Sequence, residues 1–230
     1  MRITEYAQRF QDKAILWQPP RQEIVKLRHL LALRARFKKV RKILGVPVGE
    51  LDKFSEKIIK KTNTKVLDEL DEQIREVEKQ IEQPIHDDAN LKRVHKIVTS
   101  IDGIGKVNSW QLLVHTNEFK NFDSAKKFAC YSGRHPDGVA PFQYSSGSST
   151  NSRSRVSHQA NKKMKELLHL AALSAVQVKG EINIYYNRKV AEGKNKMLVL
   201  NNVRNKLIHR IFKCVKENRK YEKNYMPLIV

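Results

Sequence analysis

The sequence is poor in the residues that build disulfide frameworks and zinc sites. Its 230 residues include only two cysteines, Cys130 and Cys214, too few for a disulfide framework. Neither C-x-x-C nor H-E-x-x-H occurs, and these are spacings in which Cys and His bind zinc. We therefore expect no metal site within the chain, and reduced thiols fit a cytoplasmic protein.

Long apolar runs are also absent. The most apolar stretch, residues 167–178, is shorter than the roughly 18 to 20 residues that cross a bilayer. The N-terminus has no apolar core of the kind that defines a secretory signal. We expect no membrane association and a cytoplasmic location.

Acidic residues are too few to balance the basic ones. Lysine and arginine total 45 against 24 aspartate and glutamate, a formal net charge of +21. Residues 1–90 contain 19 basic and 15 acidic side chains, whereas residues 91–230 contain 26 and 9. An excess of this size indicates a polyanionic partner. We therefore expect residues 91–230 to bind nucleic acid.

Helical periodicity runs through the first third of the chain. One helix is predicted from Arg21 to Leu44, a Gly/Pro turn at 45–49, and a second helix from about Glu50. The second helix carries apolar residues in alternating steps of three and four, as a coiled-coil seam does: Leu67, Leu70, Ile74, Val77 and Ile81. The pair is predicted to form an antiparallel hairpin that ends in a break at 83–88. We expect its seam to be exposed and to make a homo-oligomer. The basic cluster at 34–42 is either a solvated face or a strip that follows phosphates.

The remaining chain predicts an all-α fold. Further helices are expected over about 90–100, after an N-cap at Asp123 or Ser124, and over 161–178, 181–191 and 195–220. In the helix at 161–178 we expect Leu170 and Leu173 in the core. In the last helix we expect Leu198 there.

A glycine-containing turn separates two of these helices. Residues 101–107 read Ile-Asp-Gly-Ile-Gly-Lys-Val. Two glycines permit close backbone approach, and the next helix would direct free N–H groups outward, which together make a phosphate site. This interpretation gives a helix-hairpin-helix-like element that binds through Gly103, Ile104, Gly105 and Lys106. The alternative is an ordinary turn between helices.

A second polar stretch concentrates hydroxyls and arginines. Residues 143–150 read Gln-Tyr-Ser-Ser-Gly-Ser-Ser-Thr, and Arg153 and Arg155 follow. Such a stretch suits a loop that approaches phosphate, and a serine nucleophile could lie in it. It could equally be a flexible Ser/Gly loop.

Taken together, several motifs resemble one known family. They are the turn at 101–105, the aromatic stretch 119–131, Gly138 to Phe142 leading to Ser146-Gly147, Arg155 to Ser157, and 167–173. In this order they are similar to the C-terminal transposase domain of the DEDD-type insertion-sequence recombinases, the "one-ten" family. Residues 192–196 and 204–207 resemble that family's C-terminal portion.

The resemblance implies roles for particular residues. The family's nucleophile is a serine before the glycine of this loop, which matches Ser146, with Ser145 as second candidate. It forms a covalent phosphoserine link to DNA. Arg153 and Arg155 would stabilise charge that develops on the phosphate. Extra residues at 134–138 depart from the family pattern and could displace Ser146.

The resemblance also implies parts outside these motifs. Family members carry an RNase-H-like domain whose four acidic residues hold magnesium, and they use a structured guide RNA. No such tetrad is visible here. We expect residues 1–20 to be a remnant that follows the missing domain, 21–88 the coiled-coil hairpin, and 89–225 the transposase domain.

Two functions follow as expectations. The first is a truncated insertion-sequence transposase, nucleoid-associated in a prokaryotic cytoplasm, that binds and recombines DNA through Ser146 and is inactive alone. The alternative is a non-catalytic nucleic-acid-binding or oligomerisation protein that modulates an intact transposase.

Overall fold

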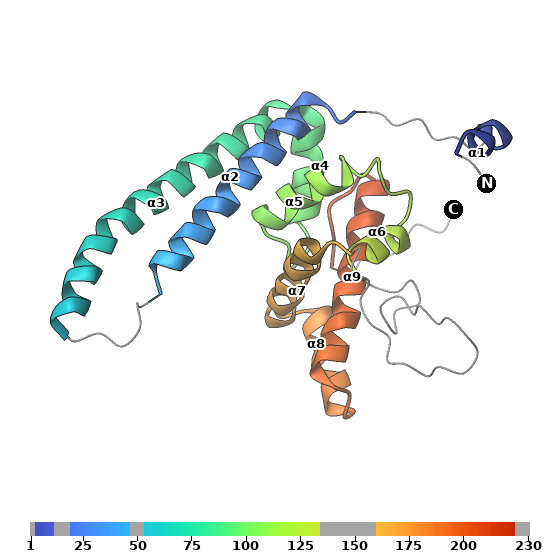
Figure 1. Ribbon diagram of the computed structural model, residues 1–230. Helices are drawn as coiled ribbons and strands as arrows, with labels where there is room; N and C mark the ends of the chain where they lie inside the picture. The colour runs from blue at the N-terminus through green and yellow to red at the C-terminus, as the bar shows by residue number, and fades with distance from the viewer. Residues whose placement is uncertain (1–2, 12–18, 47–52, 134–159, 224–230) are drawn as a thin grey trace.

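The computed structural model describes residues 3–11, 19–46, 53–133 and 160–223. Within these ranges the chain forms nine α-helices and no strand (Figure 1), so the expected all-α class is confirmed there. The helices are α1 Ile3–Arg9, α2 Gln22–Leu44, α3 Lys53–Asp87, α4 Ala89–Thr99, α5 Lys106–Thr116, α6 Ala125–Tyr131, α7 Lys162–Gln177, α8 Glu181–Ala191 and α9 Lys196–Lys216. None of the helices in these ranges combines the length and the apolar character needed to span a bilayer.

Helices α2 and α3 form a long projecting arm (Figure 1). Arg34 pairs with Glu78 at 2.7 Å and Arg41 with Asp71 at 2.5 Å, so positions that rise along α2 meet positions that fall along α3. The hairpin is therefore antiparallel, as predicted.

The seam of α3 lies inside this arm rather than on its surface. Ile74, Val77 and Ile81 are buried, and the last two join the core with Ile24 and Leu27 of α2. The expectation of an exposed seam is thus wrong at these positions, because α2 of the same chain covers them.

In place of the predicted break at 83–88, a single residue, Asp88, separates α3 from α4. Helix α3 continues through Pro84 to Asp87, and the Asp88 N–H donates to the Pro84 carbonyl at 3.2 Å. Proline removes one backbone donor, but buried Ile85 holds the last turn against the core. Asp88 then caps α4 by accepting from the Leu91 N–H at 2.8 Å.

Helices α4 to α9 form a second body, in which α9 packs against α4, α6, α7 and α8. Aromatic rings fill one side of α9: Phe212 lies 5.1 Å from Phe119 and 5.4 Å from Phe128, centroid to centroid. Trp110 and Phe128 are fully buried. Ser124 caps α6 by accepting from the Lys127 N–H, one of the two caps expected.

Three leucines expected in the core are exposed. Leu170, Leu173 and Leu198 have exposed fractions of 53%, 36% and 41%. The stripe that α7 buries is instead mostly alanine: Met164, Leu168, Ala171, Ala172 and Ala175. Small side chains let neighbouring backbones approach, and a helix that buries one stripe turns its other leucines outward.

An ion-pair cluster joins the arm to the body. Arg21, just before α2, donates to both carboxylate oxygens of Glu118 at 2.8 and 2.9 Å and to Asp88 at 2.7 Å. The Glu118 side chain is fully buried. The hydrogen bond from Arg21 holds the pKa of Asp88 below its usual range. The cluster therefore fixes the start of α2 against the turn after α5.

Candidate nucleic-acid interface

The turn between α4 and α5 was the first predicted phosphate site. It is closed by a hydrogen bond from the Ile104 N–H to the Ile101 carbonyl at 3.0 Å. Both isoleucine side chains are buried. They anchor the turn to the body, while Gly105 and Lys106 are exposed at its outer end.

Gly103 serves packing between helices. Its φ of +87° lies in the left-handed region that favours glycine. A Cβ at this position would stand 2.5 Å from the Ala171 carbonyl oxygen and 2.6 Å from the Ala175 Cβ. The close approach that Gly103 permits is therefore to α7.

Gly105 and Lys106 open α5 on the other side of the turn. Gly105 is the N-cap, and nothing lies within 4 Å of a Cβ built on it. Its carbonyl accepts from the Ser109 N–H at 3.1 Å, and the N–H groups of the first turn have no partner within the helix. Lys106 Nζ donates to Glu82 of α3 at 2.7 Å, which raises the lysine pKa. Phosphate binding at this turn remains a prediction.

The predicted serine site falls outside the described residues. Ser145, Ser146, Arg153 and Arg155 all lie between 134 and 159. Their placement relative to one another and to the glycine turn therefore stays a prediction.

The residues that flank this segment lie together. The Asn161 N–H donates to the Tyr131 carbonyl at 2.8 Å, and Asn161 Nδ2 donates to the Tyr131 hydroxyl at 2.6 Å. The same hydroxyl lies 3.0 Å from His115 Nδ1. Asn161 also caps α7 by accepting from the Met164 N–H. The end of α6 and the start of α7 are thus joined by hydrogen bonds between Tyr131 and Asn161, a pair here called the fixed base of the segment.

Burial sets the charge state at this point. Desolvation lowers the pKa of His115, and the positive charges of Lys163 and Arg28 lower it further. A neutral imidazole can accept at Nδ1 from the Tyr131 hydroxyl. The lowered pKa of His115 therefore suits this contact, which lies close to the positive charges of Lys163 and Arg28.

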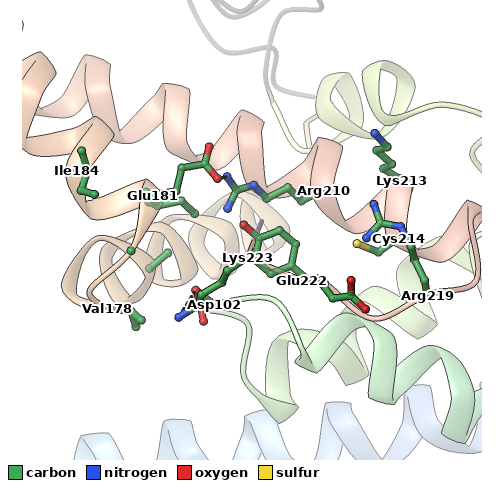
Figure 2. Close-up of a pocket in the computed structure, with 14 residues that line it drawn as sticks. Asp102, Val178, Glu181, Ile184, Arg210, Lys213, Cys214, Arg219, Glu222 and Lys223 are labelled. Atoms are coloured by element: carbon green, nitrogen blue, oxygen red, sulfur yellow. Dashed lines mark hydrogen bonds and ion pairs between the residues drawn. The ribbon is translucent and has the colours of Figure 1, made fainter. Parts of the chain in front are cut away.

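A separate cavity of about 670 Å³ lies between α8, α9 and the chain after α9 (Figure 2). Two of its basic side chains are paired with acids: Arg210 with Glu181 at 2.6 Å and Lys223 with Asp102 at 3.4 Å. Burial raises the pKa of the Cys214 thiol on its wall, which disfavours the nucleophilic thiolate. This cavity offers neither a free positive charge cluster nor an activated nucleophile.

The described residues do not fit the magnesium site that the resemblance implies. Among residues 3–11, 19–46, 53–133 and 160–223, no three His, Cys, Asp or Glu side chains are grouped so as to hold a metal ion. We derive no step through a metal from this chain.

One segment of the chain is similar to a known protein family. Residues 95–187 match the family described as Transposase IS116/IS110/IS902. Over these residues the chain is similar to this transposase family. The match begins within α4 and ends within α8. It contains the glycine turn and residues 134–159, here called the Ser146 segment.

Two curated relatives are similar to a longer part of the chain. Each is named pilin gene-inverting protein, one from Moraxella bovis and one from Moraxella lacunata, and each is 26% identical over 151 residues. The similarity covers 65% of this chain and 45% of each relative. The chain therefore spans less than half the length of these relatives.

Sequence reasoning missed the residues that join the ends of the Ser146 segment. Asn161 was recognisable as a helix start, because asparagine is a favoured N-cap. Its contact with Tyr131 depends on how α6 and α7 pack, and no local pattern encodes that contact.

Proposed function

We propose that this chain acts in DNA recombination through its transposase domain, with Ser146 as the nucleophile and Ser145 as the second candidate. The match of residues 95–187 to the transposase family carries the proposal. The hydroxyl oxygen would attack a DNA phosphorus and displace a deoxyribose oxygen, which conserves the phosphodiester energy in a phosphoserine link. Arg153 and Arg155 would offset the charge that develops on the phosphate.

The fixed base of the segment supports this role. Because Tyr131 and Asn161 are hydrogen-bonded, the residues on either side of the segment that contains Ser146 lie together on the body that carries the glycine turn. A nucleophile and a phosphate site that belong to the same body would gain from proximity. DNA is the proposed substrate, and a structured guide RNA is the proposed partner.

A covalent-adduct assay tests the nucleophile. The full chain is incubated with labelled duplex DNA and magnesium, together with an intact family member whose own serine is replaced by alanine, to supply the acidic domain. We expect a denaturation-resistant adduct on this chain that Ser146→Ala abolishes and the neighbouring Ser149→Ala preserves. Loss with Ser145→Ala instead would move the nucleophile by one residue.

A non-catalytic role is the second candidate. The excess of basic over acidic residues in 91–230 supports binding without chemistry. In that case no adduct forms on this chain, and Ser146→Ala binds DNA as the wild type does, with affinity that falls steeply with salt.

We also propose that the arm makes a homo-oligomer. Its seam is covered within the chain, but Ile43, Ile58 and Val66 keep exposed fractions of 62%, 50% and 46%. Exposed apolar positions on a helical pair favour a second pair as partner. Light scattering should show a mass above the monomer that falls when Ile43 and Ile58 become serine; an unchanged mass would exclude this surface.

A further inference from the structure

Three basic side chains lie on α7 and α9, two helices that pack against each other. Lys165 and His169 lie one turn apart on α7, and Arg204 lies on α9. All three are half-buried. The positive charge of Arg204 acts on both partners, and that of Lys165 acts on His169. They therefore form one electrostatic cluster, here called the α7–α9 cluster.

No acidic residue compensates this cluster within the described chain. Neither Lys165 nor Arg204 makes an ion pair with any described residue, although Arg34 and Arg210, also half-buried, are each paired with a glutamate. The Nε of Arg204 and the Nδ1 of His169 are fully buried and have no hydrogen-bond partner there. Two nitrogen atoms, one a guanidinium donor and the other an imidazole nitrogen whose role depends on the tautomer, are thus held out of water without a partner among the described residues.

Such an arrangement is costly without an anion. A buried polar group that lacks a partner loses its hydration without replacement. Desolvation is the first cause that lowers the pKa of Arg204, and it does the same for Lys165 and His169. An oxyanion bound beside the three side chains would offset the mutual repulsion of their positive charges.

We propose that Lys165, His169 and Arg204 form a binding site for a phosphate group of the nucleic-acid backbone. The site rests on the proposed function, which brings DNA to this domain. Arginine offers a planar fork to two phosphate oxygens, lysine a point charge, and histidine a single N–H donor. Lys165 lies one turn after Asn161, on the helix that leads out of the fixed base of the Ser146 segment. A phosphate held here would position the DNA strand relative to that base.

Charge-neutral variants of the cluster test the site. Lys165→Gln, Arg204→Gln and the double variant are compared with Lys189→Gln, whose lysine is already paired with Glu192 at 2.6 Å. Fluorescence anisotropy with a DNA duplex is measured over a range of salt. We expect each cluster variant to bind about tenfold more weakly. We also expect each to lower the slope of log affinity against log salt by about one. Lys189→Gln should change affinity less than about twofold.

Thermal unfolding separates binding from a structural role. Without ligand, Arg204→Gln should melt at or above the wild-type temperature, because an uncompensated buried charge is removed. Inorganic phosphate should raise the Tm of the wild type more than that of the double variant. A clear fall in Tm for Arg204→Gln without ligand would mean that the arginine holds the helices together, and would overturn the proposal.

The two measurements distinguish this site from the proposed function. If the wild type and the double variant bind DNA with equal affinity and salt slope, the site is overturned while DNA binding stands. If the wild type binds no DNA at moderate salt, the proposed function fails. The rise in Tm with inorganic phosphate then tests the phosphate site independently of DNA binding. A rise in the wild type but not in the double variant supports the site, and equal rises in both reject it.

Discussion

Two half-buried arginines show how the arm and the body differ. Arg34 on α2 places its Nε 2.7 Å from a Glu78 oxygen, whereas Arg204 on α9 has no described acidic partner and a buried Nε without a hydrogen bond. The arm compensates its partly buried charge internally. The body pairs Arg210 with Glu181 but leaves Arg204 without an acidic partner among the described residues.

This difference follows the distribution of acids in the sequence. Residues 91–230 contain 9 acidic side chains for 26 basic ones. Acidic side chains near α8 and α9 already pair with other basic residues: Glu181 with Arg210, and Glu217 with Lys213. An interior cation there must find its anion elsewhere. Net charge thus indicates the kind of partner, whereas a half-buried cation without a counter-ion indicates where that partner would bind.

The largest expected effect breaks the packing of the body and leaves the arm intact. Gly103→Ala forces a Cβ to 2.5 Å from the Ala171 carbonyl oxygen at a φ of +87°. Strain and overpacking together should cost about 3 kcal/mol or more. Chemical denaturation monitored by Trp110 fluorescence measures the loss.

Gly105→Ala is the matched control, because the space beside Gly105 is open and its φ is −87°. We expect a cost of about 1 kcal/mol or less from the weaker N-cap. Equal losses at the two glycines would contradict the assignment of Gly103 to helix packing.

The next effect concerns the joint between the two regions. Arg21→Ala leaves the fully buried Glu118 carboxylate with Asn90 and a Lys120 contact at 3.5 Å. Stranding a buried charge should cost about 2 to 3 kcal/mol. Denaturant unfolding compares it with Arg41→Ala, which removes an exposed pair near the end of the arm.

We expect no resolvable change from Arg41→Ala, since exposed ion pairs are screened by solvent. If Arg41→Ala destabilised the protein as strongly as Arg21→Ala, the arm would depend on its surface pairs, and the contrast between exposed and buried pairs would fail.

The sequence predicted local features well and tertiary ones poorly. Periodicity located α2, α7, α8 and α9 to within a few residues, because each helix has a clear apolar repeat and a turn or cap at its ends. It misplaced Leu170 and Leu198, because which stripe of a helix is buried depends on its neighbours. The helix through Pro84 escaped prediction for the same reason: burial of Ile85 outweighs one lost hydrogen bond.

The candidate site divides in the same way. Gly103 and Gly105 were recognised by residue type, but only packing shows that they face opposite surroundings. No local pattern links Lys165 with Arg204, because they lie on two helices that are distant in sequence and come together only in the fold. The resemblance that named Ser146 came from ordered motifs, which a single local pattern could not supply.

A smaller effect tests the fixed base of the Ser146 segment. Asn161→Asp keeps an oxygen to cap α7 but removes the Nδ2 donor to Tyr131, whereas Asn161→Ala removes both. We expect about 1 kcal/mol for the lost cap and about 1 kcal/mol for the lost hydrogen bond. The free energy of unfolding, measured with denaturant, should therefore decrease from the wild type to Asn161→Asp and again to Asn161→Ala. Equal stabilities of the two variants would mean that the Asn161 cap contributes nothing.

The smallest effect sharpens the comparison through pH. Three half-buried histidines of the body, His95, His115 and His169, have pKa values lowered chiefly by desolvation, whereas His29 and His86 of the arm are exposed. Below the ordinary histidine pKa of 6.5, the unfolded chain binds protons that the folded body does not. Stability therefore falls as pH drops from about 7 toward 5. The carboxylate of Asp88, with its pKa lowered from 3.8, keeps its contribution to stability throughout that pH range.

The Tm of the wild type should therefore be lower at pH 5 than at pH 7, and His95→Gln should make this difference slightly smaller. One histidine can change the free energy of unfolding by at most about 1.4 kcal/mol per pH unit. His29→Gln should leave the difference in Tm unchanged. An equal response to both substitutions would mean that burial in the body does not control the titration.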